Sequence, residues 1–145
     1  MKKLLLTLVC VFAVTLTASA DKDKPITESQ LPAAARQFIK TYFPKNKIAM
    51  AKLESDLLSK EYDVIFTNGD KLEFNSKGNW TVVNCKNSAV PDAIVPTQIK
   101  TYVKTNYPKH TIKVIEKKGS NTEIELSNKW EITFNSKYQV IDIDD

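Results

Sequence analysis

His110 is the first residue to consider for chemistry, because it is the only histidine in the chain. A Ser-His-Asp hydrolase or a histidine-activated thiol enzyme would have to use it as the base. His110 follows Pro108-Lys109 at an expected helix-to-strand turn, and Asn46 stands at the matching position of an earlier, similar segment. We therefore predict a solvent-exposed histidine and a protein that is not an enzyme.

Cys85 is the second candidate, since the other cysteine, Cys10, lies in a segment that we expect to be removed. A single remaining cysteine cannot form an intramolecular disulfide. Three interpretations are open: a covalent dimer, a reactive thiol, or a small half-buried side chain at the end of a strand. The third is favoured, because a catalytic thiol needs a base and His110 is the only histidine.

Carboxylates gather at two places in the sequence. Asp142, Asp144 and Asp145 crowd the C-terminus and could attract a hard cation, whereas Glu123 and Glu125 share one strand face and could serve a glycosidase. We predict solvated surface groups at both places. One histidine and one cysteine cannot form the usual zinc or iron site, and the few glycines suit turns rather than a phosphate-binding loop. The sequence thus predicts no catalytic residue, no metal and no cofactor.

Residues 1–20 have the pattern of a secretory signal peptide. Met1-Lys2-Lys3 is basic, residues 4–17 are almost wholly apolar, and Ala18-Ser19-Ala20 offers small residues for cleavage. The apolar stretch is short for a membrane span, so a retained anchor is the weaker alternative. We expect a mature protein that starts at Asp21, is periplasmic or secreted, and has no stable membrane insertion after cleavage.

The composition is typical of one soluble globular domain. The chain has 145 residues, of which 42% are hydrophobic and 26% are charged. These values exclude a collagen, a coiled coil, a disordered tail and a multi-span membrane protein. Cleavage would remove Lys2 and Lys3 and no acid, so the formal net charge would fall from +4 to +2. Lysines alternate with acids along the mature chain, and therefore we do not expect a nucleic-acid partner.

The mature chain matches itself in two places. Residues 31–48 align with 95–112 at an offset of 64, and residues 62–83 align with 122–143 at an offset of 60. The second match includes Phe74-Asn75-Ser76-Lys77, whose four letters recur at the matching position. Self-similarity of this kind indicates a duplicated structural unit.

The change of offset means that the second copy lacks four residues of the first. Such a deletion belongs in a loop, which we place at residues 55–60. The sequence therefore predicts a single domain, residues 21–145, made of two repeats at about 26–86 and 90–145.

Each copy is expected to begin with an amphipathic helix. Apolar residues recur at helical spacing between Pro32 and Pro44, and again between Pro96 and Pro108. Proline is tolerated in the first turn of a helix and stops a helix elsewhere. We predict one helix between each pair of prolines, with its aromatic stripe packed in the core.

Four strands should follow each helix, because apolar and polar residues alternate with period two. Asn68-Gly69 between two such runs is a strong signal of a tight hairpin. The second copy departs from the pattern, with Lys129 and Tyr138 where the first has Gly69 and Gly78. The expected fold class is α+β, a tandem repeat of a helix plus a four-stranded antiparallel meander, with the helices packed on one face of the sheet. The expected strands are 48–54, 61–67, 70–75, 80–84, 112–116, 122–126, 130–135 and 138–143.

These features together resemble the PepSY-like periplasmic proteins of unknown function, which share the fold of beta-lactamase inhibitor protein. The resemblance rests on the exported start, the two copies, the Phe-Pro helix ending and the segment Phe74–Val83, and it covers Pro25–Asp145. That family has no established catalytic residues. Among proteins of this fold, the inhibitor grips an enzyme with an exposed sheet face, and PepSY domains accompany peptidases. The resemblance therefore implies an interaction scaffold, by analogy of fold.

The expected binding surface is the sheet face that the helices leave uncovered. If Ile141 and Ile143 of the second copy are core residues, then Trp80 and its counterpart Val140 point outwards. A β-bulge that turns Trp80 into the core is the open alternative. Aromatic and apolar side chains among charged ones are typical of a protein interface. The expected partner-binding residues are Trp80, Val82, Ile65, Tyr138 and Val140.

The sequence thus favours an exported, non-catalytic binding module that acts through the open sheet face. Its partner would be an unidentified exported protein or peptide, which it would inhibit or chaperone. The alternative is a periplasmic sensor that binds a small molecule or a cation in a groove between the repeats. The oligomeric state stays open.

Overall fold

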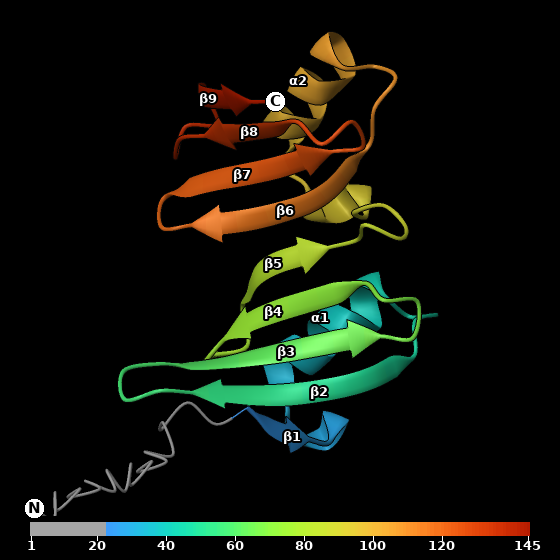
Figure 1. The fold of residues 1–145 in the computed structure, drawn as a ribbon, viewed down its shortest axis with the longest axis vertical. Helices are drawn as coiled ribbons and strands as arrows, with labels where there is room; N and C mark the ends of the chain where they lie inside the picture. Colours follow the sequence, from blue (N-terminus) through green and yellow to red (C-terminus); the bar gives the residue numbers. More distant parts are fainter. Residues whose placement is uncertain (1–22) are drawn as a thin grey trace, which may run out of the picture.

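The computed structural model describes residues 23–145, and the expected signal peptide, residues 1–20, lies outside them. Within the described residues the fold is α+β, with two α-helices and one antiparallel sheet of nine strands (Figure 1). The strands lie side by side in chain order, from β1 at one edge to β9 at the other. The elements are β1 (Lys24–Ile26), η1 (Glu28–Gln30), α1 (Ala33–Tyr42), β2 (Ile48–Ser55), β3 (Lys60–Phe66), β4 (Lys71–Asn75), β5 (Trp80–Asn84), η2 (Asp92–Ile94), α2 (Thr97–Asn106), β6 (Ile112–Lys118), β7 (Asn121–Leu126), β8 (Glu131–Phe134) and β9 (Val140–Asp144).

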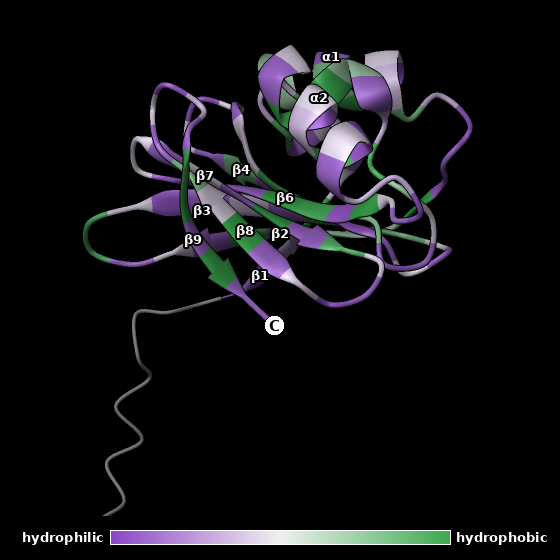
Figure 2. Ribbon diagram, turned by 90° about the horizontal axis from the view of Figure 1, so that it is seen from above, coloured by the Kyte–Doolittle hydropathy of each residue, from purple (hydrophilic) through white to green (hydrophobic). Residues whose placement is uncertain are grey.

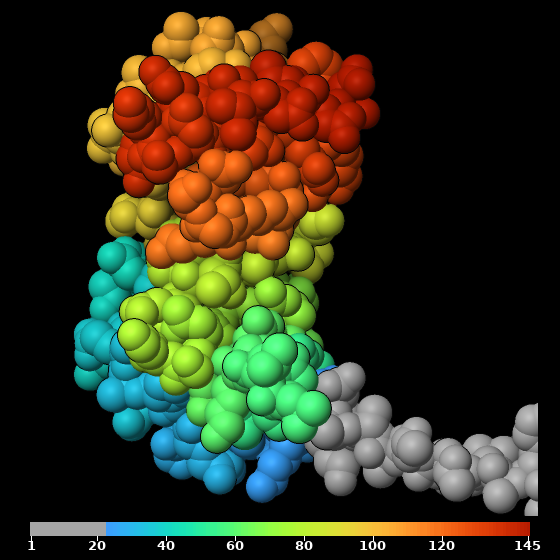
Figure 3. All heavy atoms as spheres, turned by 90° about the vertical axis from the view of Figure 1, so that its left-hand side faces the viewer, coloured from blue at the N-terminus to red at the C-terminus, as the bar shows by residue number. Residues whose placement is uncertain are grey.

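Both α-helices begin directly after a proline, as the sequence predicts. Pro32 and Pro96 occupy the N-cap positions, and Pro44 and Pro108 follow the helix ends. Figure 2 shows α1 and α2 on the same side of the sheet. The opposite side carries no helix among the described residues, and Figure 3 shows this division edge-on. No helix within residues 23–145 combines the length and apolar character that crossing a membrane needs.

The core lies between the helices and the inward side chains of the sheet. Phe38 of α1 packs edge-on against Phe74 of β4, with ring centroids 5.6 Å apart. Tyr102 of α2 makes the same kind of contact with Phe134 of β8, at 5.5 Å. Edge-to-face aromatic packing of this kind adds stability beyond the burial of area. The aromatic stripes of both helices are therefore core residues, as expected.

Strand β1 is absent from the prediction. It has only three residues, and Ile26, opposite Ala51 of β2, is the one that packs against the core. So short a segment shows no alternation of apolar and polar residues, and Pro25 argues against a strand unless that strand lies at an edge. The sheet therefore has β1 and β9 as its two edge strands.

The β7–β8 and β8–β9 turns form although they have no glycine at the position where the equivalent turns of the first half have one. Lys129 and Tyr138 adopt positive φ values of 75° and 58°. The side chain of Asn135 accepts hydrogen bonds from the backbone N–H groups of Lys137 and Gln139, at 2.9 and 3.0 Å. These bonds within the turn offset the cost of a left-handed conformation at Tyr138, so the turn keeps its shape without glycine.

One continuous sheet joins the two halves of the molecule, and β5 pairs with β6 at the junction. The segment between β5 and η2 is fastened by Asp70, which is 1% exposed. Its carboxylate accepts hydrogen bonds from the N–H of Asn87 (3.0 Å), the side-chain amide of Asn68 (2.9 Å) and the hydroxyl of Ser88. Asp70 thus ties the β3–β4 turn to the link between the halves.

Candidate functional site

The candidate site is the open face, defined here as the side of the sheet opposite α1 and α2. Residues opposite each other on antiparallel strands share a face. Asp63 of β3 lies opposite Glu73 of β4, which lies opposite Val82 of β5. Val82 in turn lies opposite Glu116 of β6, and Glu116 lies opposite Glu123 of β7. A row rich in carboxylates therefore crosses the open face.

Apolar side chains lie near the middle of this face. Ile65 and Val82 are both half-buried and both belong to the open face, as the sequence predicts. Met50 of β2 lies opposite Ile65 and is 48% exposed, and Val114 of β6 lies two residues from Glu116 on the same face. Apolar side chains surrounded by charge are the composition of a protein interface.

Trp80 lies on the other face, and the expectation that it points outwards is corrected. A β-bulge between Glu73 and Phe74 leaves Thr81 without a partner and places Trp80 opposite Phe74. The Trp80 ring lies 6.3 Å from that of Phe38, and the ammonium group of Lys117 sits 4.0 Å from its centre. The structure therefore contains the β-bulge that turns Trp80 towards the core, which was the alternative left open by the sequence.

Val140 and Tyr138 also lie on the helix side. A second bulge, between Thr133 and Phe134, leaves Ile141 unpaired and places Val140 opposite Phe134. Val140 and Tyr138 are half-buried against the core, whereas Ile141 is 53% exposed. Of the five expected binding residues, the structure brings only Ile65 and Val82 to the open face.

In the N-terminal half of the open face, lysines are ion-paired with a larger number of carboxylates. Asp63 is 2% exposed, and its carboxylate lies 2.8 Å from the Lys71 ammonium and 3.9 Å from that of Lys52. Lys71 also contacts Glu73 at 2.8 Å. Burial alone would lower the pKa of Lys71, but the bonds to the two carboxylates outweigh it and raise that pKa overall. This half is an ion-pair network in which two lysines bridge four carboxylates, those of Asp23, Glu54, Asp63 and Glu73.

In the C-terminal half of the open face, carboxylates outnumber lysines. Burial raises the pKa of Glu116, and so does repulsion from Glu123, Glu73 and Glu131, which Lys118 opposes only in part. Lys118 lies 2.8 Å from Glu123. Lys86 and Lys129 reach Glu125 from neighbouring turns. This surface, here called the acidic half-face, is formed by Glu116, Glu123, Glu125, Glu131, Asp142 and Asp144.

His110 and its surroundings were considered as a catalytic site. His110 is half-buried rather than exposed, and its Nδ1 lies 3.2 Å from the hydroxyl of Ser127. That hydroxyl also accepts a hydrogen bond from the backbone N–H of Thr111. Within residues 23–145 no carboxylate bonds to His110, and no three side chains of His, Cys, Asp or Glu are grouped to hold a metal.

Cys85 is fully buried, which agrees with the structural interpretation of this residue. Burial, together with the charge of Asp70, raises the pKa of the Cys85 thiol to about 11. The thiolate is the reactive form of cysteine. At neutral pH the Cys85 thiol is therefore protonated and shielded.

We expect Cys85 to resist modification by a disulfide reagent such as dithionitrobenzoate in the native protein. The same thiol should react promptly in urea, because unfolding exposes it and returns its pKa to the ordinary range. The absorbance of released thionitrobenzoate at pH 8 measures both rates. Equal rates in the native and unfolded protein would contradict the burial of this side chain.

A groove of about 590 Å³ lies where the two halves meet on the helix side. Phe38 and Trp80 contribute aromatic walls from the N-terminal half, and Lys117 and Gly119 contribute from the C-terminal half. Burial lowers the pKa of Lys117. The groove is therefore aromatic, with a cationic side chain.

Residues 18–56 and 60–142 match the protein family described as "Putative beta-lactamase-inhibitor-like, PepSY-like". The chain belongs to the PepSY-like family. The resemblance inferred from the sequence is thus confirmed. The family match leaves out residues 57–59, at the tip of the β2–β3 hairpin, where Leu57 and Leu58 are 91% and 97% exposed.

Solved structures of relatives agree with this PepSY-like assignment. A "putative periplasmic protein" of the DUF2874 family from Bacteroides vulgatus is 60% identical, with a TM-score of 0.84, and the match covers 88% of this chain and 100% of that one. A "putative calcium-regulated periplasmic protein" from Bacteroides thetaiotaomicron is 51% identical, with a TM-score of 0.83, covering 85% and 97%. A "putative periplasmic protein of unknown function" from Bacteroides vulgatus is 36% identical, with a TM-score of 0.81, covering 86% and 100%. No curated protein matches the chain.

The relatives of this PepSY-like protein are described as periplasmic. The predicted location, periplasmic or secreted, is therefore confirmed.

Proposed function

We propose that the protein is a non-catalytic binding module, built from two copies of one helix-and-strand unit, whose open face holds a basic protein or peptide. The observation that carries this proposal is the excess of carboxylates on the acidic half-face. Opposite charge speeds encounter with a basic partner and discriminates against acidic ones. The apolar residues Ile65, Val82 and Val114 would form the water-excluding centre of the contact.

The environment of His110 supports a non-catalytic role. A Ser-His hydrolase needs a third group that orients the histidine and donors that stabilise an oxyanion. Within residues 23–145 the Ser127 hydroxyl is the hydrogen-bond partner of the His110 side chain. The same hydroxyl already accepts the N–H of Thr111, which makes it a structural link between two loops.

The proposal is tested by reversing charge at the rim of the acidic half-face. Glu131 and Asp144 are exposed, lie opposite each other on β8 and β9, and form no ion pair within residues 23–145. The double variant Glu131→Lys/Asp144→Lys should fold normally and lose its partner. The matched control is Glu28→Lys/Asp92→Lys, which makes the same charge change on the helix side.

Both variants and the wild type would be used to capture proteins from envelope extract, and each captured protein would then be purified and titrated by calorimetry. We expect the wild type and the control to bind the same basic protein, and the open-face variant to bind it at least tenfold more weakly at low salt. Val82→Ala should cost about 1 kcal/mol or more of binding free energy if it lies at the centre. Equal binding by all variants would place the partner elsewhere and refute the proposal.

A second candidate, cation binding, is favoured by one relative. The Bacteroides thetaiotaomicron protein, 51% identical, is described as "putative calcium-regulated". The aromatic groove between the halves contains Lys117 and does not suit a cation. The carboxylates of the open face would have to come together to provide the site, because within residues 23–145 no three of them are grouped to hold a metal. A melting temperature that rises with calcium concentration but not with magnesium supports this function, and an unchanged melting temperature excludes it.

A further inference from the structure

The helix side carries two grooves, one along each α-helix, that match each other position by position. The α1 groove has a volume of about 760 Å³ and the α2 groove about 490 Å³. Every residue that lines the α1 groove has a counterpart, 64 positions further along the chain, that lines the α2 groove. The grooves are therefore equivalent in construction.

In the α1 groove, Arg36 and Lys40 are one helical turn apart and stand over an apolar floor of Ile39 and Phe43. Ile39 and Phe43 are each 5% exposed. Glu28 is the acidic residue among the residues that line it. The groove thus combines two cations with a hydrophobic base.

The α2 groove has the same plan. Lys100 and Lys104 take the positions of the two cations, and Val103 and Tyr107 form the floor. Asp92 takes the position of Glu28. Side chains four residues apart lie on the same face of a helix, so each pair presents two positive charges together.

These four cations have no partner among the described residues. Within residues 23–145, Arg36, Lys40, Lys100 and Lys104 do not lie within 4 Å of any carboxylate oxygen. Three lysines of the open face, by contrast, are ion-paired: Lys52, Lys71 and Lys118. The groove cations are therefore available to an anionic ligand.

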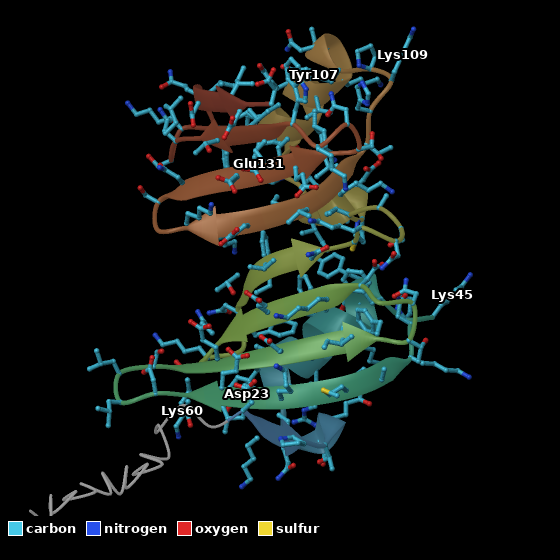
Figure 4. All side chains as sticks on the ribbon, viewed as in Figure 1. Asp23, Lys45, Lys60, Tyr107, Lys109 and Glu131 are labelled. Atoms are coloured by element: carbon cyan, nitrogen blue, oxygen red, sulfur yellow. The ribbon has the colours of Figure 1, made fainter. Side chains whose placement is uncertain are left out.

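The two grooves open along the same long edge of the molecule. Pro44 and Pro108 line the ends of the grooves, and Figure 4 shows the next residues, Lys45 and Lys109, projecting from one edge. Equivalent points of the two halves are four strands apart, which corresponds to about 19 Å. About six residues of extended chain span that distance.

We propose that the paired grooves form one bivalent site for an acidic peptide segment that lies along this edge and places a carboxylate cluster in each groove. Binding in one groove would raise the local concentration of the second cluster at the other groove, so the two contacts reinforce each other. A peptide fits better than an anionic membrane, because the cations lie beside hollows with aliphatic and aromatic floors. The exposed apolar residues that a membrane would need lie elsewhere, on β2, β9 and the β2–β3 hairpin: Met50, Ile141, Ile143, Leu57 and Leu58. This site is separate from the open face, so either proposal can fail alone.

The probe is a fluorescein-labelled peptide of about twelve residues, rich in Glu with interspersed Leu, long enough to span both grooves. A peptide of about five residues with the same composition fills one groove only. Fluorescence anisotropy at 0.15 M salt measures binding, because long-range attraction is then screened beyond about 8 Å. Vesicles containing phosphatidylglycerol provide the membrane comparison.

The variants are Arg36→Glu/Lys40→Glu, Lys100→Glu/Lys104→Glu and the combination of the two pairs. The matched control is Lys77→Glu/Lys137→Glu, two exposed turn lysines that line neither groove. It makes the same charge change as each groove pair. Circular dichroism checks that every variant is folded.

We expect the long peptide to bind at least tenfold more tightly than the short one. Each double variant in a single groove should weaken binding of the long peptide by about tenfold or more, and the variant that combines both pairs should abolish it. The control variant should change the affinity for the long peptide by less than about twofold. The bivalent site is refuted if the control weakens binding as much as a groove pair does, or if the long peptide binds no more tightly than the short one. Binding to vesicles but not to either peptide would also overturn the proposal, in favour of a membrane surface.

Discussion

Gly78→Ala is expected to lower the free energy of unfolding by about 3 kcal/mol or more. Gly78 has a φ of +82° and lies in the β4–β5 turn, beneath the start of α1. An added Cβ would lie 2.7 Å from Cβ of Pro32 and 2.9 Å from the backbone nitrogen of Ala35. Neither atom can move without shifting α1 from the sheet.

Gly119→Ala separates the cost of backbone strain at positive φ from the cost of the steric clash with α1. Gly119 has a φ of +61°, and an added Cβ would meet no atom within 4 Å. This variant therefore carries the backbone strain alone, which is about 1 kcal/mol. Urea unfolding of both variants gives the comparison. If the two lose equal stability, the close approach of α1 to the β4–β5 turn contributes nothing, and our description of this contact is wrong.

The second large effect concerns Asp70. Asp70→Ala should lower the free energy of unfolding by about 2–4 kcal/mol, because it removes three hydrogen bonds to a charged carboxylate that is itself buried. The N–H of Asn87 and the hydroxyl of Ser88 would both lose their bond to the carboxylate. The link between β5 and η2 would then be held less firmly to the β3–β4 turn. Chemical denaturation measures the loss, and proteolysis would be expected to cut the protein near Asn87.

Asp56 is the matched control for Asp70, since its carboxylate also accepts backbone hydrogen bonds, from Leu58 and Ser59 at 2.7 Å. These bonds lower the pKa of Asp56, so the stability they provide is present above the ordinary pKa of an aspartate and is lost as the pH falls through the lowered value. Asp56 is exposed, and water can replace its contacts. Asp56→Ala should therefore have a much smaller effect, and a loss equal to that of Asp70→Ala would show that burial does not matter here.

The helices and strands whose ends are marked by proline or by a tight-turn sequence could be predicted from the sequence. Pro32 and Pro44 enclose α1, and strands β3 and β4 flank the Asn68-Gly69 turn as expected. These signals are local, because they depend on backbone geometry within a few residues. The α+β class followed from them, and the structure confirms it.

The direction of Trp80 could not be predicted in the same way. Alternation of apolar and polar residues assigns side chains to the two faces of a sheet only while the pairing register is regular. The extra residue Thr81 interrupts the register, so the residue before it in β5, Trp80, lies on the face opposite to the one that alternation predicts. The bulge arises in the pairing of β5 with β4, which no single segment reveals. The same error affected Val140, because Ile141 is the extra residue in β9.

The two grooves on the helix side also could not be predicted from the sequence. Arg36 and Lys40 have the spacing of an ordinary solvated helix face. The hollow beside them exists only because η1 and the segment after Phe43 rise next to α1. Such a surface depends on how separate segments meet, and residue types alone do not show it.

The two edge strands have a consequence for how the protein behaves at high concentration. An unpaired strand edge is a template on which further chains can add, and a nine-stranded sheet offers two such edges. At one end Pro25 interrupts the row of N–H donors on a strand of three residues. At the other end, β9 carries a negative charge that repels the β9 edge of a second molecule; the acidic residues are Asp142, Asp144 and Asp145. We therefore expect individual molecules to stay dispersed rather than to join into ribbons.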